Sequence, residues 1–275
     1  MIPDTTIIDE VRRALSEDIG SGDISASLVD PDQSLKARLL LREPAVLCGT
    51  AWFDEVCRQC NPDIQIDWKA QDGDQLPAET IVCYLSGPAG AILTAERSAL
   101  NFLQTLSGTA TTTRHYVNLI TNTRCRILDT RKTIPNLRLA QKYAVRCGGG
   151  TNHRIGLFDA FLIKENHLAA AGSIAEAVTR ARALNKSVLL EVEVESLGQL
   201  DEAVNAGVDR VLLDNFSLTN LKLAVERYSE KIELEASGNI TDESLVKIAA
   251  TGVNYVSIGA LTKHLKAIDY SLRYI

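Results

Sequence analysis

The second half of the chain repeats one pattern six times, a short run of β-forming residues followed by a segment with helical character. Capping boxes at residues 173–176 and 196–199 mark helix starts, and Gly207 and Gly252 mark helix ends. Strands that alternate with helices predict a parallel sheet covered by those helices. Six units rather than eight predict an open β/α barrel. The predicted strands are residues 126–129, 160–164, 188–193, 210–214, 232–235 and 255–259.

The first half of the chain lacks this alternation. A helix is expected near residues 4–17, and the sequence then predicts strands near residues 35–42, 64–68 and 80–86, followed by helical segments at 91–106 and 111–121. This order predicts a separate α+β domain in a protein of the α/β class. The predicted boundaries are residues 1–108 for this domain and 109–265 for the barrel, with residues 266–275 able to pack back on the first domain.

Polar residues or glycine end every predicted strand of the second half. In β/α barrels the carboxyl ends of the strands converge on one mouth, where active sites lie. Any one of these residues alone would more often be a surface residue, but six together favour an active site. The strand ends are Asp129, Lys164, Glu193, Asp214, Glu235 with the following Ser237 and Gly238, and Gly259.

Residues 131–158 contain six Lys or Arg residues and no acidic residue, although the whole chain has a formal net charge of -6. Neighbouring cations repel one another unless an anion lies between them, so this segment predicts a pocket for a ligand with several carboxylates or phosphates. The alternative is a solvated basic face or a nucleic-acid patch. The three successive glycines at residues 148–150 make that alternative less probable.

Glu193 and Asp214 are carboxylates at the ends of neighbouring predicted strands. Mg²⁺ binds a few carboxylates together with substrate phosphate and water, so these two residues predict a magnesium site for a phosphorylated substrate. A structural ion pair between Lys164 and Glu193 is the alternative that stays open. Turns at residues 237–239 and 257–260 end the last two strands, where barrels commonly bind phosphate.

Composition argues against several other classes of protein. A chain of 275 residues with 45% hydrophobic content supports a core without disulfide bonds. Its acidic net charge argues against general binding to nucleic acid or to anionic membranes. The sequence has no secretory pattern and no apolar run of about 20 residues, so a cytoplasmic protein is expected. Cys57 and Cys60 have metal-ligand spacing without a second Cys/His pair nearby, which favours a packing role on a helix.

Six motifs stand out in the barrel half: residues 129–135 (DTRKTIP), 142–150 (KYAVRCGGG), 152–154 (NHR), 162–167 (LIKENH), 191–195 (EVEVE) and 212–215 (LLDN). They resemble the quinolinate phosphoribosyltransferases, the carboxylating nicotinate-nucleotide pyrophosphorylases, and the similarity runs from about residue 8 to residue 263. The resemblance implies an N-terminal α+β sandwich domain beside an open six-stranded parallel β/α barrel. It also implies an enzyme that joins quinolinate to phosphoribosyl pyrophosphate (PRPP) and releases pyrophosphate and CO2. The product would be nicotinate mononucleotide, for NAD synthesis.

The resemblance further implies roles for individual residues. Lys164 would lie between the two substrates, while Glu193 and Asp214 would hold Mg²⁺ and the ribose hydroxyls. Residues 237–239 and 258–260 would bind phosphates. The quinolinate site would contain Arg131, Lys132, His153 and Arg154. The full set of implied substrate-binding residues is Arg97, Thr130, Arg131, Lys132, His153, Arg154, Lys164, Glu193, Asp214, Ser237, Gly238, Asn239, Ile258, Gly259 and Ala260, with Lys132, Lys164, Glu193 and Asp214 as catalytic residues.

Two positions in this set need separate comment. Asn239 stands where the family pattern has glycine after Ser-Gly, which affects the phosphate loop. Arg97 matches an arginine that the family supplies from the partner subunit, so the resemblance implies a homodimer with a shared active site. On the expected helix, Arg97 would point away from the apolar positions that face the core. Those positions are Leu93, Ala99, Leu100, Leu103 and Leu106.

The implied chemistry fits the residues. Arginine binds carboxylates through two parallel hydrogen bonds, and quinolinate is a planar dianion. Two other functions remain as alternatives. Lys164 could form a Schiff base in an aldolase-like barrel, because that chemistry uses a lysine at a strand end. The chain could also be a divergent molybdenum-associated relative without the activity, although such relatives lack the motif at residues 163–167 that this chain retains.

Overall fold

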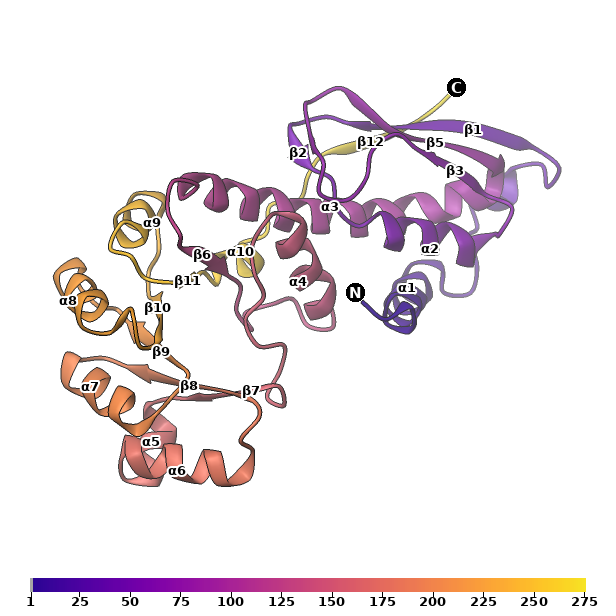
Figure 1. Cartoon of the computed structure of the whole chain (residues 1–275). Helices are drawn as coiled ribbons and strands as arrows, with labels where there is room; N and C mark the ends of the chain where they lie inside the picture. The colour runs from indigo at the N-terminus through magenta and orange to yellow at the C-terminus, as the bar shows by residue number, and fades with distance from the viewer. Residues whose placement is uncertain (1) are drawn as a thin grey trace. The chain divides into compact units, whose positions relative to one another are not determined.

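The computed structural model describes residues 2–275, which form two compact units (Figure 1). The first unit contains residues 2–114, Thr133–Gly149 and Leu261–Ile275, and the second contains His115–Lys132 and Gly150–Ala260. The chain therefore passes between the units at residues 114–115, 132–133, 149–150 and 260–261. The single boundary after residue 108 stays a prediction, and a helix continues through that residue. Among residues 2–275, no helix is both long and apolar enough to cross a membrane.

The first unit is built on a four-stranded antiparallel sheet with the strand order β12-β1-β5-β3. Its strands are β1 (Ser34–Leu41), β3 (Gln65–Trp68), β5 (Thr80–Pro88) and β12 (Tyr270–Tyr274), and a small second sheet pairs β2 (Ala45–Val46) with β4 (Gln75–Leu76). Strand β12 pairs with β1, so the last residues of the chain complete the first sheet.

Helices cover one face of this sheet and form the core with it (Figure 1). These helices are α1 (Asp4–Ile19), α2 (Thr50–Cys60) and the first part of α3 (Ala89–Leu119). Three short elements complete the description of this part of the chain: the 3-10 turn η1 (Ala26–Leu28), α4 (Arg138–Cys147) and α10 (Ala260–Lys263). Trp52 and Phe53 from α2 are almost fully buried against Leu39 and Leu41 of β1. The predicted packing role of Cys57 and Cys60 is confirmed, because both lie in or against this core.

Helix α3 is continuous, so the prediction of two helical segments at 91–106 and 111–121 was wrong. The intervening small residues are buried, and a Cβ on Gly108 would lie 2.3 Å from the carbonyl oxygen of Lys266. Glycine is therefore required there by close packing and does not end the helix. Leu93 was also wrongly placed in the core, because it is 37% exposed. The other four apolar positions of the prediction are buried.

The second unit contains a parallel six-stranded sheet with the order β6-β11-β10-β9-β8-β7. Its strands are β6 (Arg126–Leu128), β7 (Ala160–Ile163), β8 (Leu189–Val194), β9 (Arg210–Asp214), β10 (Glu233–Ser237) and β11 (Tyr255–Ser257). All six predicted strands are present. The first strand pairs with the last and not with β7, so the sheet is open between β6 and β7, and the predicted fold class is confirmed.

Helices α5 (Glu165–Ala171), α6 (Ile174–Leu184), α7 (Leu197–Ala206), α8 (Leu218–Tyr228) and α9 (Asp242–Ala249) alternate with these strands (Figure 1). The local signals that predicted them are in place. The hydroxyls of Ser173 and Ser196 accept hydrogen bonds from the backbone of the third residue of each helix. Gly207 follows α7 with a left-handed φ of 79°, as a C-terminal glycine should.

One segment lies at the opening of the barrel. The backbone N–H of Thr151 donates to the carbonyl of Ile127 (2.8 Å), and Asp129 donates its N–H to the carbonyl of Thr151 (3.2 Å). Thr151 thus forms a parallel bridge with Leu128 on the free edge of β6. The residues that follow, including His153 and Arg154, continue from this contact within the second unit.

Candidate active site

The carboxyl ends of β8, β9 and β10 bring the predicted carboxylates and phosphate loop to one end of the sheet. Ser237 is in register with Asp214, and Glu193 is in register with Leu212, two residues before Asp214. Side chains alternate between the faces of a strand, so Glu193 shares a face with Glu191, and Asp214 shares a face with Arg210. The predicted strand end at Glu235 was wrong, because β10 continues to Ser237 and Glu235 lies fully buried in mid-strand.

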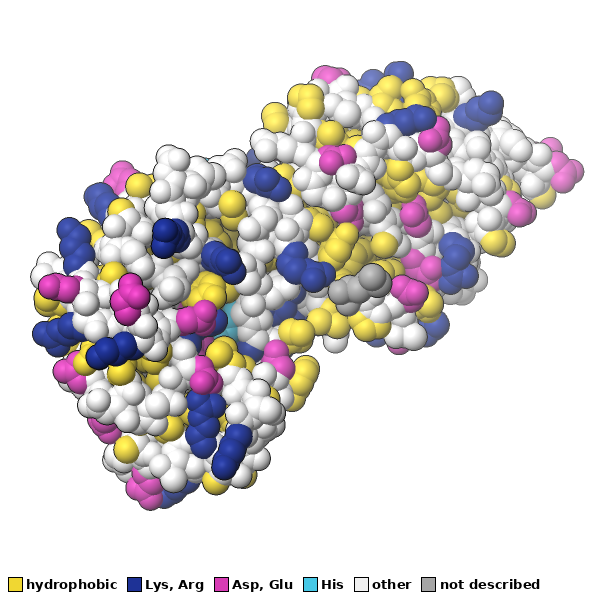
Figure 2. All heavy atoms as spheres, viewed as in Figure 1, with side chains coloured by type: hydrophobic (Ala, Val, Ile, Leu, Met, Phe, Trp, Pro, Cys, Tyr) yellow, Lys and Arg dark blue, Asp and Glu magenta, His cyan; other side chains and the backbone are white. Residues whose placement is uncertain are grey.

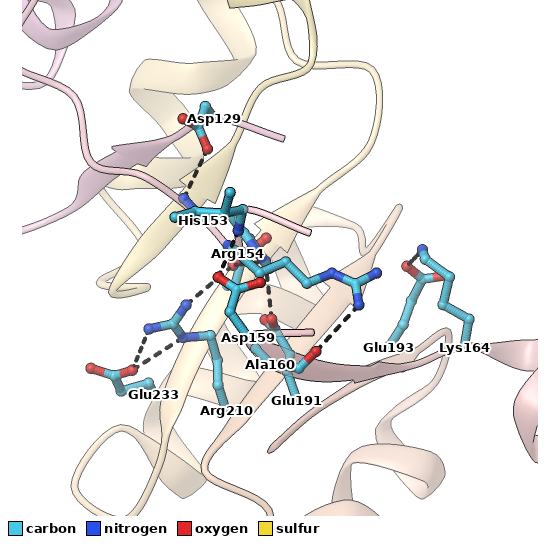
Figure 3. Close-up of polar contacts among 12 residues, drawn as sticks. Asp129, His153, Arg154, Asp159, Ala160, Lys164, Glu191, Glu193, Arg210 and Glu233 are labelled. Atoms are coloured by element: carbon cyan, nitrogen blue, oxygen red, sulfur yellow. Dashed lines mark hydrogen bonds and ion pairs between the residues drawn. The ribbon is translucent and has the colours of Figure 1, made fainter. Parts of the chain in front are cut away.

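Lys164 and Glu193 form an ion pair at this end of the barrel (Figure 3). The side chain of Glu193 is mostly buried, whereas that of Lys164 is 40% exposed. Lys164 caps α5, and its backbone N–H donates to Nδ1 of His167 (3.0 Å). The ion pair that the sequence left open is therefore present. It holds one ammonium group beside one carboxylate at the mouth where the substrates were expected.

A second contact fixes the loop that follows β6. The backbone N–H of Lys132 donates to Oγ1 of Thr130 (3.1 Å). A Cβ on Gly259 would lie 2.8 Å from Cδ of Lys132 and 3.5 Å from Oγ1 of Thr130. The absence of a side chain at Gly259 therefore leaves room for Lys132, which joins the loop after β6 to the loop after β11. Ile258 is buried and Gly259 and Ala260 are partly exposed in that loop.

Arg131 and Arg154 are close enough to affect each other electrostatically. Burial lowers the pKa of Arg154, and repulsion from the Arg131 guanidinium lowers it further. Arg154 donates to the carbonyl of Ala160 (3.3 Å), while Arg131 is exposed. Two guanidinium groups that repel each other at a partly open position are the kind of arrangement that an anion can stabilise.

The cationic segment is divided between the two units. Arg131, Lys132 and Arg154 belong to the second unit, whereas the other three cations lie on α4 in the first unit. On the face shown in Figure 2, Lys and Arg side chains are interspersed with Asp and Glu. That face does not carry the continuous basic stripe of a nucleic-acid-binding protein.

His153 points into the barrel, and both of its ring nitrogens contact protein groups (Figure 3). Nδ1 accepts the backbone N–H of Arg154 (2.7 Å), so the ring proton lies on Nε2. Nε2 is 3.0 Å from Oε2 of Glu191 and 3.5 Å from Oε2 of Glu235. The side chain is 7% exposed. The resemblance assigned His153 to quinolinate, and in this structure its imidazole contacts the interior carboxylates.

Buried Asp129 holds the same segment from the other side. Its carboxylate accepts the backbone N–H of His153 (2.8 Å) and the side-chain amide of Asn152 (2.6 Å). It therefore anchors the segment that carries His153 and Arg154.

Sequence reasoning did not assign Glu191 to this site, and it placed Glu235 only at a strand end at the mouth. Both are 0% exposed. Burial raises the pKa of Glu191 to about 7. Burial and then the charge of Glu191 raise the pKa of Glu235 to about 8. The available signal was the spacing of glutamates two residues apart within apolar strands, which places them on one face.

Arg210 compensates part of this interior charge. Its guanidinium donates to Oε2 of Glu233 (2.7 Å), lies 3.8 Å from Oε2 of Glu235 and stacks on the ring of Tyr255 at 4.2 Å. The interior of the barrel is therefore a polar network beneath the mouth (Figure 3).

The loop after β10 contains two successive residues with positive φ, Gly238 and Asn239. Gly238 has φ 106°, and a Cβ there would lie 2.1 Å from Oδ1 of Asn215, so glycine is required. Asn239 has φ 44°, a left-handed conformation that asparagine tolerates better than most residues with a side chain. The backbone at position 239 therefore accommodates asparagine where the family pattern has glycine. Ser237, Gly238 and Asn239 line a cavity of about 380 Å³ between α8 and α9.

Arg97 lies on α3 in the first unit, and its side chain is exposed. It belongs to a different compact unit from the other candidate residues, all of which lie in the second unit.

Known proteins match the chain over nearly its whole length. The family description "Quinolinate phosphoribosyl transferase, N-terminal domain" matches residues 23–107, and the corresponding C-terminal domain matches residues 109–273. A Bacillus subtilis protein named probable nicotinate-nucleotide pyrophosphorylase (carboxylating) is 42% identical over 93% of this chain and 89% of its own length. Quinolinate phosphoribosyltransferase (decarboxylating) 1b of Nicotiana tabacum is 36% identical over 96% of this chain and 81% of its own length.

The fold agrees with these sequence matches. The solved structure of the nicotinate-nucleotide pyrophosphorylase from Francisella tularensis superposes with a TM-score of 0.96 at 50% identity, covering 100% of this chain and 98% of that one. Since both domain descriptions match and these relatives cover nearly all of it, the chain belongs to the quinolinate phosphoribosyltransferase family.

Proposed function

We propose that this protein transfers the phosphoribosyl group of PRPP to quinolinate and releases pyrophosphate and CO2, giving nicotinate mononucleotide for NAD synthesis. The observation that carries the proposal is the pair of neighbouring guanidiniums, Arg131 and Arg154, in the unit that also carries the Lys164–Glu193 ion pair. An acceptor with two carboxylates matches two arginines, and a ribose phosphate donor matches the carboxylates and turns at the strand ends.

Quinolinate binding is assigned to Arg131, Lys132 and Arg154. The fork of an arginine pairs with a planar carboxylate through two hydrogen bonds, and Lys132 adds a point charge from the same loop. His153 is assigned a positioning role in quinolinate binding. Its ring accepts the backbone N–H of Arg154 and so fixes the backbone of that arginine. Binding a dianion would relieve the repulsion between Arg131 and Arg154.

The transfer step needs positioning and charge stabilisation more than proton transfer. The lone pair of the quinolinate nitrogen forms a bond to the anomeric carbon as the bond to pyrophosphate breaks, and positive charge develops on the ribose. We assign Glu193 and Asp214, which lie at the ends of neighbouring strands, to the stabilisation of this charge, and Lys164 to the stabilisation of the departing oxygens. The pyridinium ring then accepts the electron pair left when the adjacent carboxylate departs as CO2, and a proton replaces it. The nitrogen already carries its lone pair, so no general base is required.

Magnesium is proposed as the cofactor, held by Glu193 and Asp214. Two carboxylates at neighbouring strand ends fit the preference of Mg²⁺ for one or two protein carboxylates completed by substrate phosphates and water. When bound, Mg²⁺ neutralises charge on the pyrophosphate. Glu193 also pairs with Lys164, so this carboxylate would serve both the metal and the ammonium group. Residues 237–239 and 258–260 are assigned to the phosphates, because backbone N–H groups of such turns bind anions.

The direct test is to incubate the purified protein with quinolinate, PRPP and Mg²⁺ and to measure nicotinate mononucleotide and CO2. Nicotinic acid in place of quinolinate should not react, because one missing carboxylate leaves site cations unpaired. Equal turnover of both acids would refute the assignment of the arginine pair.

A Schiff-base lyase using Lys164 is not favoured, because the chain belongs to the quinolinate phosphoribosyltransferase family and Lys164 is paired with Glu193. Borohydride trapping should therefore give no adduct at Lys164. A divergent relative without the activity is also not favoured, because the relatives named above carry the names of the enzyme.

We also propose a homodimer in which Arg97 of one subunit completes the quinolinate site of the other. An exposed arginine on a helix is consistent with this role. Arg97→Ala and Lys164→Ala proteins, each inactive alone, should recover activity when mixed, because one site of each mixed dimer has both wild-type residues. No recovery despite demonstrated subunit exchange would refute the shared site. The proposed location is the cytoplasm, where a chain with six free cysteines stays reduced.

A further inference from the structure

A second cluster of ligand-type side chains lies in the first unit, which is separate from the barrel. The sulfurs of Cys48 and Cys147 and a carboxylate oxygen of Asp72 all lie within 4.8 Å of one another. The three residues come from distant parts of the chain. Cys48 immediately precedes the N-terminal cap of α2, Asp72 lies in the loop between β3 and β4, and Cys147 is the last residue of α4.

The carboxylate of this cluster is held in place. Asp72 accepts the backbone N–H groups of Gly49 (3.0 Å) and Thr50 (3.2 Å) at the start of α2, and the hydroxyl of Tyr143 on α4 (2.9 Å). These bonds fix the Asp72 carboxylate beside both sulfurs, with only its remaining lone pairs available for a further partner. Positioned ligands lower the ordering cost of binding an ion.

The two sulfurs also differ in character. Cys48 is fully buried and Cys147 is partly exposed. Cys147 is therefore the ligand that an entering ion reaches first.

We propose that Cys48, Asp72 and Cys147 form a binding site for a single Zn²⁺ ion. Two sulfurs and one carboxylate are a ligand set for this borderline-soft ion, whereas Mg²⁺ requires oxygen ligands. A tetrahedral ion takes a fourth ligand, which we assign to water. The thiol protons leave to solvent as the metal–sulfur bonds form.

The site would join three segments of the first unit. It links the start of α2, the loop that contains Asp72, and the end of α4, which are separated by long stretches of sequence. An ion that binds the folded form and not the unfolded one stabilises the fold. Its role is therefore structural and lies outside the transfer reaction.

The test uses the full-length protein, stripped of metal and kept reduced with a non-chelating phosphine. Zn²⁺ is titrated against a chromophoric chelator in the presence of excess Mg²⁺, and Co²⁺ is used as a spectroscopic probe. We expect one tightly bound Zn²⁺ per chain and, with Co²⁺, a thiolate charge-transfer band together with the visible bands of a four-coordinate ion. Occupancy is measured without any activity assay, so the result is independent of the proposed function.

Cys147→Ser should weaken Zn²⁺ binding by more than about 100-fold, since even outer partners of metal ligands contribute 10- to 100-fold. Cys60→Ser is the matched control, because Cys60 is also partly exposed at the end of a helix, and it should retain wild-type affinity. Tyr143→Phe, which removes the hydrogen bond to Asp72, should weaken binding by roughly 10-fold. A reduced wild-type protein that binds no Zn²⁺, or equal losses in the Cys147→Ser and Cys60→Ser proteins, would overturn the site.

Discussion

Replacing Glu235 with glutamine should change how the stability of the protein depends on pH. Glu235 is 0% exposed, and burial followed by repulsion from Glu191 raises its pKa from 4.5 to about 8. Below about pH 8, Glu235 of the folded protein holds its proton. In the unfolded chain the same residue loses its proton above about pH 4.5. The folded state therefore binds more protons between these values, and its stability falls as pH rises through this window.

The magnitude follows from the size of the shift. One pKa unit corresponds to about 1.4 kcal/mol, so Glu235 should remove up to about 3 kcal/mol of unfolding free energy between about pH 5 and about pH 7. Glutamine resembles the protonated glutamic acid and cannot ionise. Glu235→Gln should therefore match the wild type near pH 5 and become progressively more stable than the wild type at higher pH.

Urea denaturation followed by far-ultraviolet circular dichroism, repeated across this pH range, measures the difference. The control is Glu230→Gln, which removes an exposed carboxylate of the same unit and should run parallel to the wild type. Ordinary surface substitutions change the free energy of unfolding by about 0.5 kcal/mol. If the difference in unfolding free energy between Glu235→Gln and the wild type stays constant across pH within this scatter, Glu235 does not hold its proton and the reasoning fails.

Three further predictions concern the active site. Arg154→Ala should weaken quinolinate binding by roughly 2 to 5 kcal/mol, as for a truncated charge pair, with a much smaller effect on PRPP, measured by calorimetry with each substrate. Glu193→Gln should reduce turnover and the Mg²⁺-dependent part of PRPP affinity while leaving the circular dichroism spectrum unchanged. Gly259→Ala places a methyl group against the side chain of Lys132, so kcat/KM should fall roughly 10- to 100-fold with little loss of stability.

Each of these predictions has an outcome that would contradict it. Equal losses for both substrates in Arg154→Ala would make the arginine merely structural, and full activity in Glu193→Gln would remove that carboxylate from the proposed metal site. The control for Gly259→Ala is Gly198→Ala on α7, where the added methyl meets no atom closer than 4.0 Å and activity should be unchanged. An unchanged kcat/KM in Gly259→Ala would show that the position of Lys132 does not matter.

The strands and the helix caps of the barrel could be predicted from the sequence because their signals are local. The β-forming runs, Ser173, Ser196 and Gly207 act through neighbours a few residues away. The order of the elements then implies a parallel open sheet, since strands that alternate with helices have few other ways to pack. The specific motifs also carry the family resemblance without any geometry.

Helix α3 shows where local signals mislead. The small residues at 107–110 weaken helix propensity, and the sequence predicted a break there, but they are buried in the first unit. Gly148 is a similar case, because a Cβ there would lie 2.5 Å from the carbonyl oxygen of Ala110. One of the three successive glycines that favoured an anion pocket is therefore required by helix packing.

The sequence by itself determined the barrel strands, the cationic segment at residues 131–158 and the carboxylates at the strand ends. Each of these features depends on residues that are close together in the sequence. Only the tertiary structure decided the partners of His153. Its ring meets Glu191 and Glu235, which lie on different strands, because Thr151 pairs with the free edge of β6 and turns the following residues into the barrel. Contacts between segments so far apart in sequence depend on how the strands and the Thr151 bridge come together in the folded sheet, which no local pattern encodes.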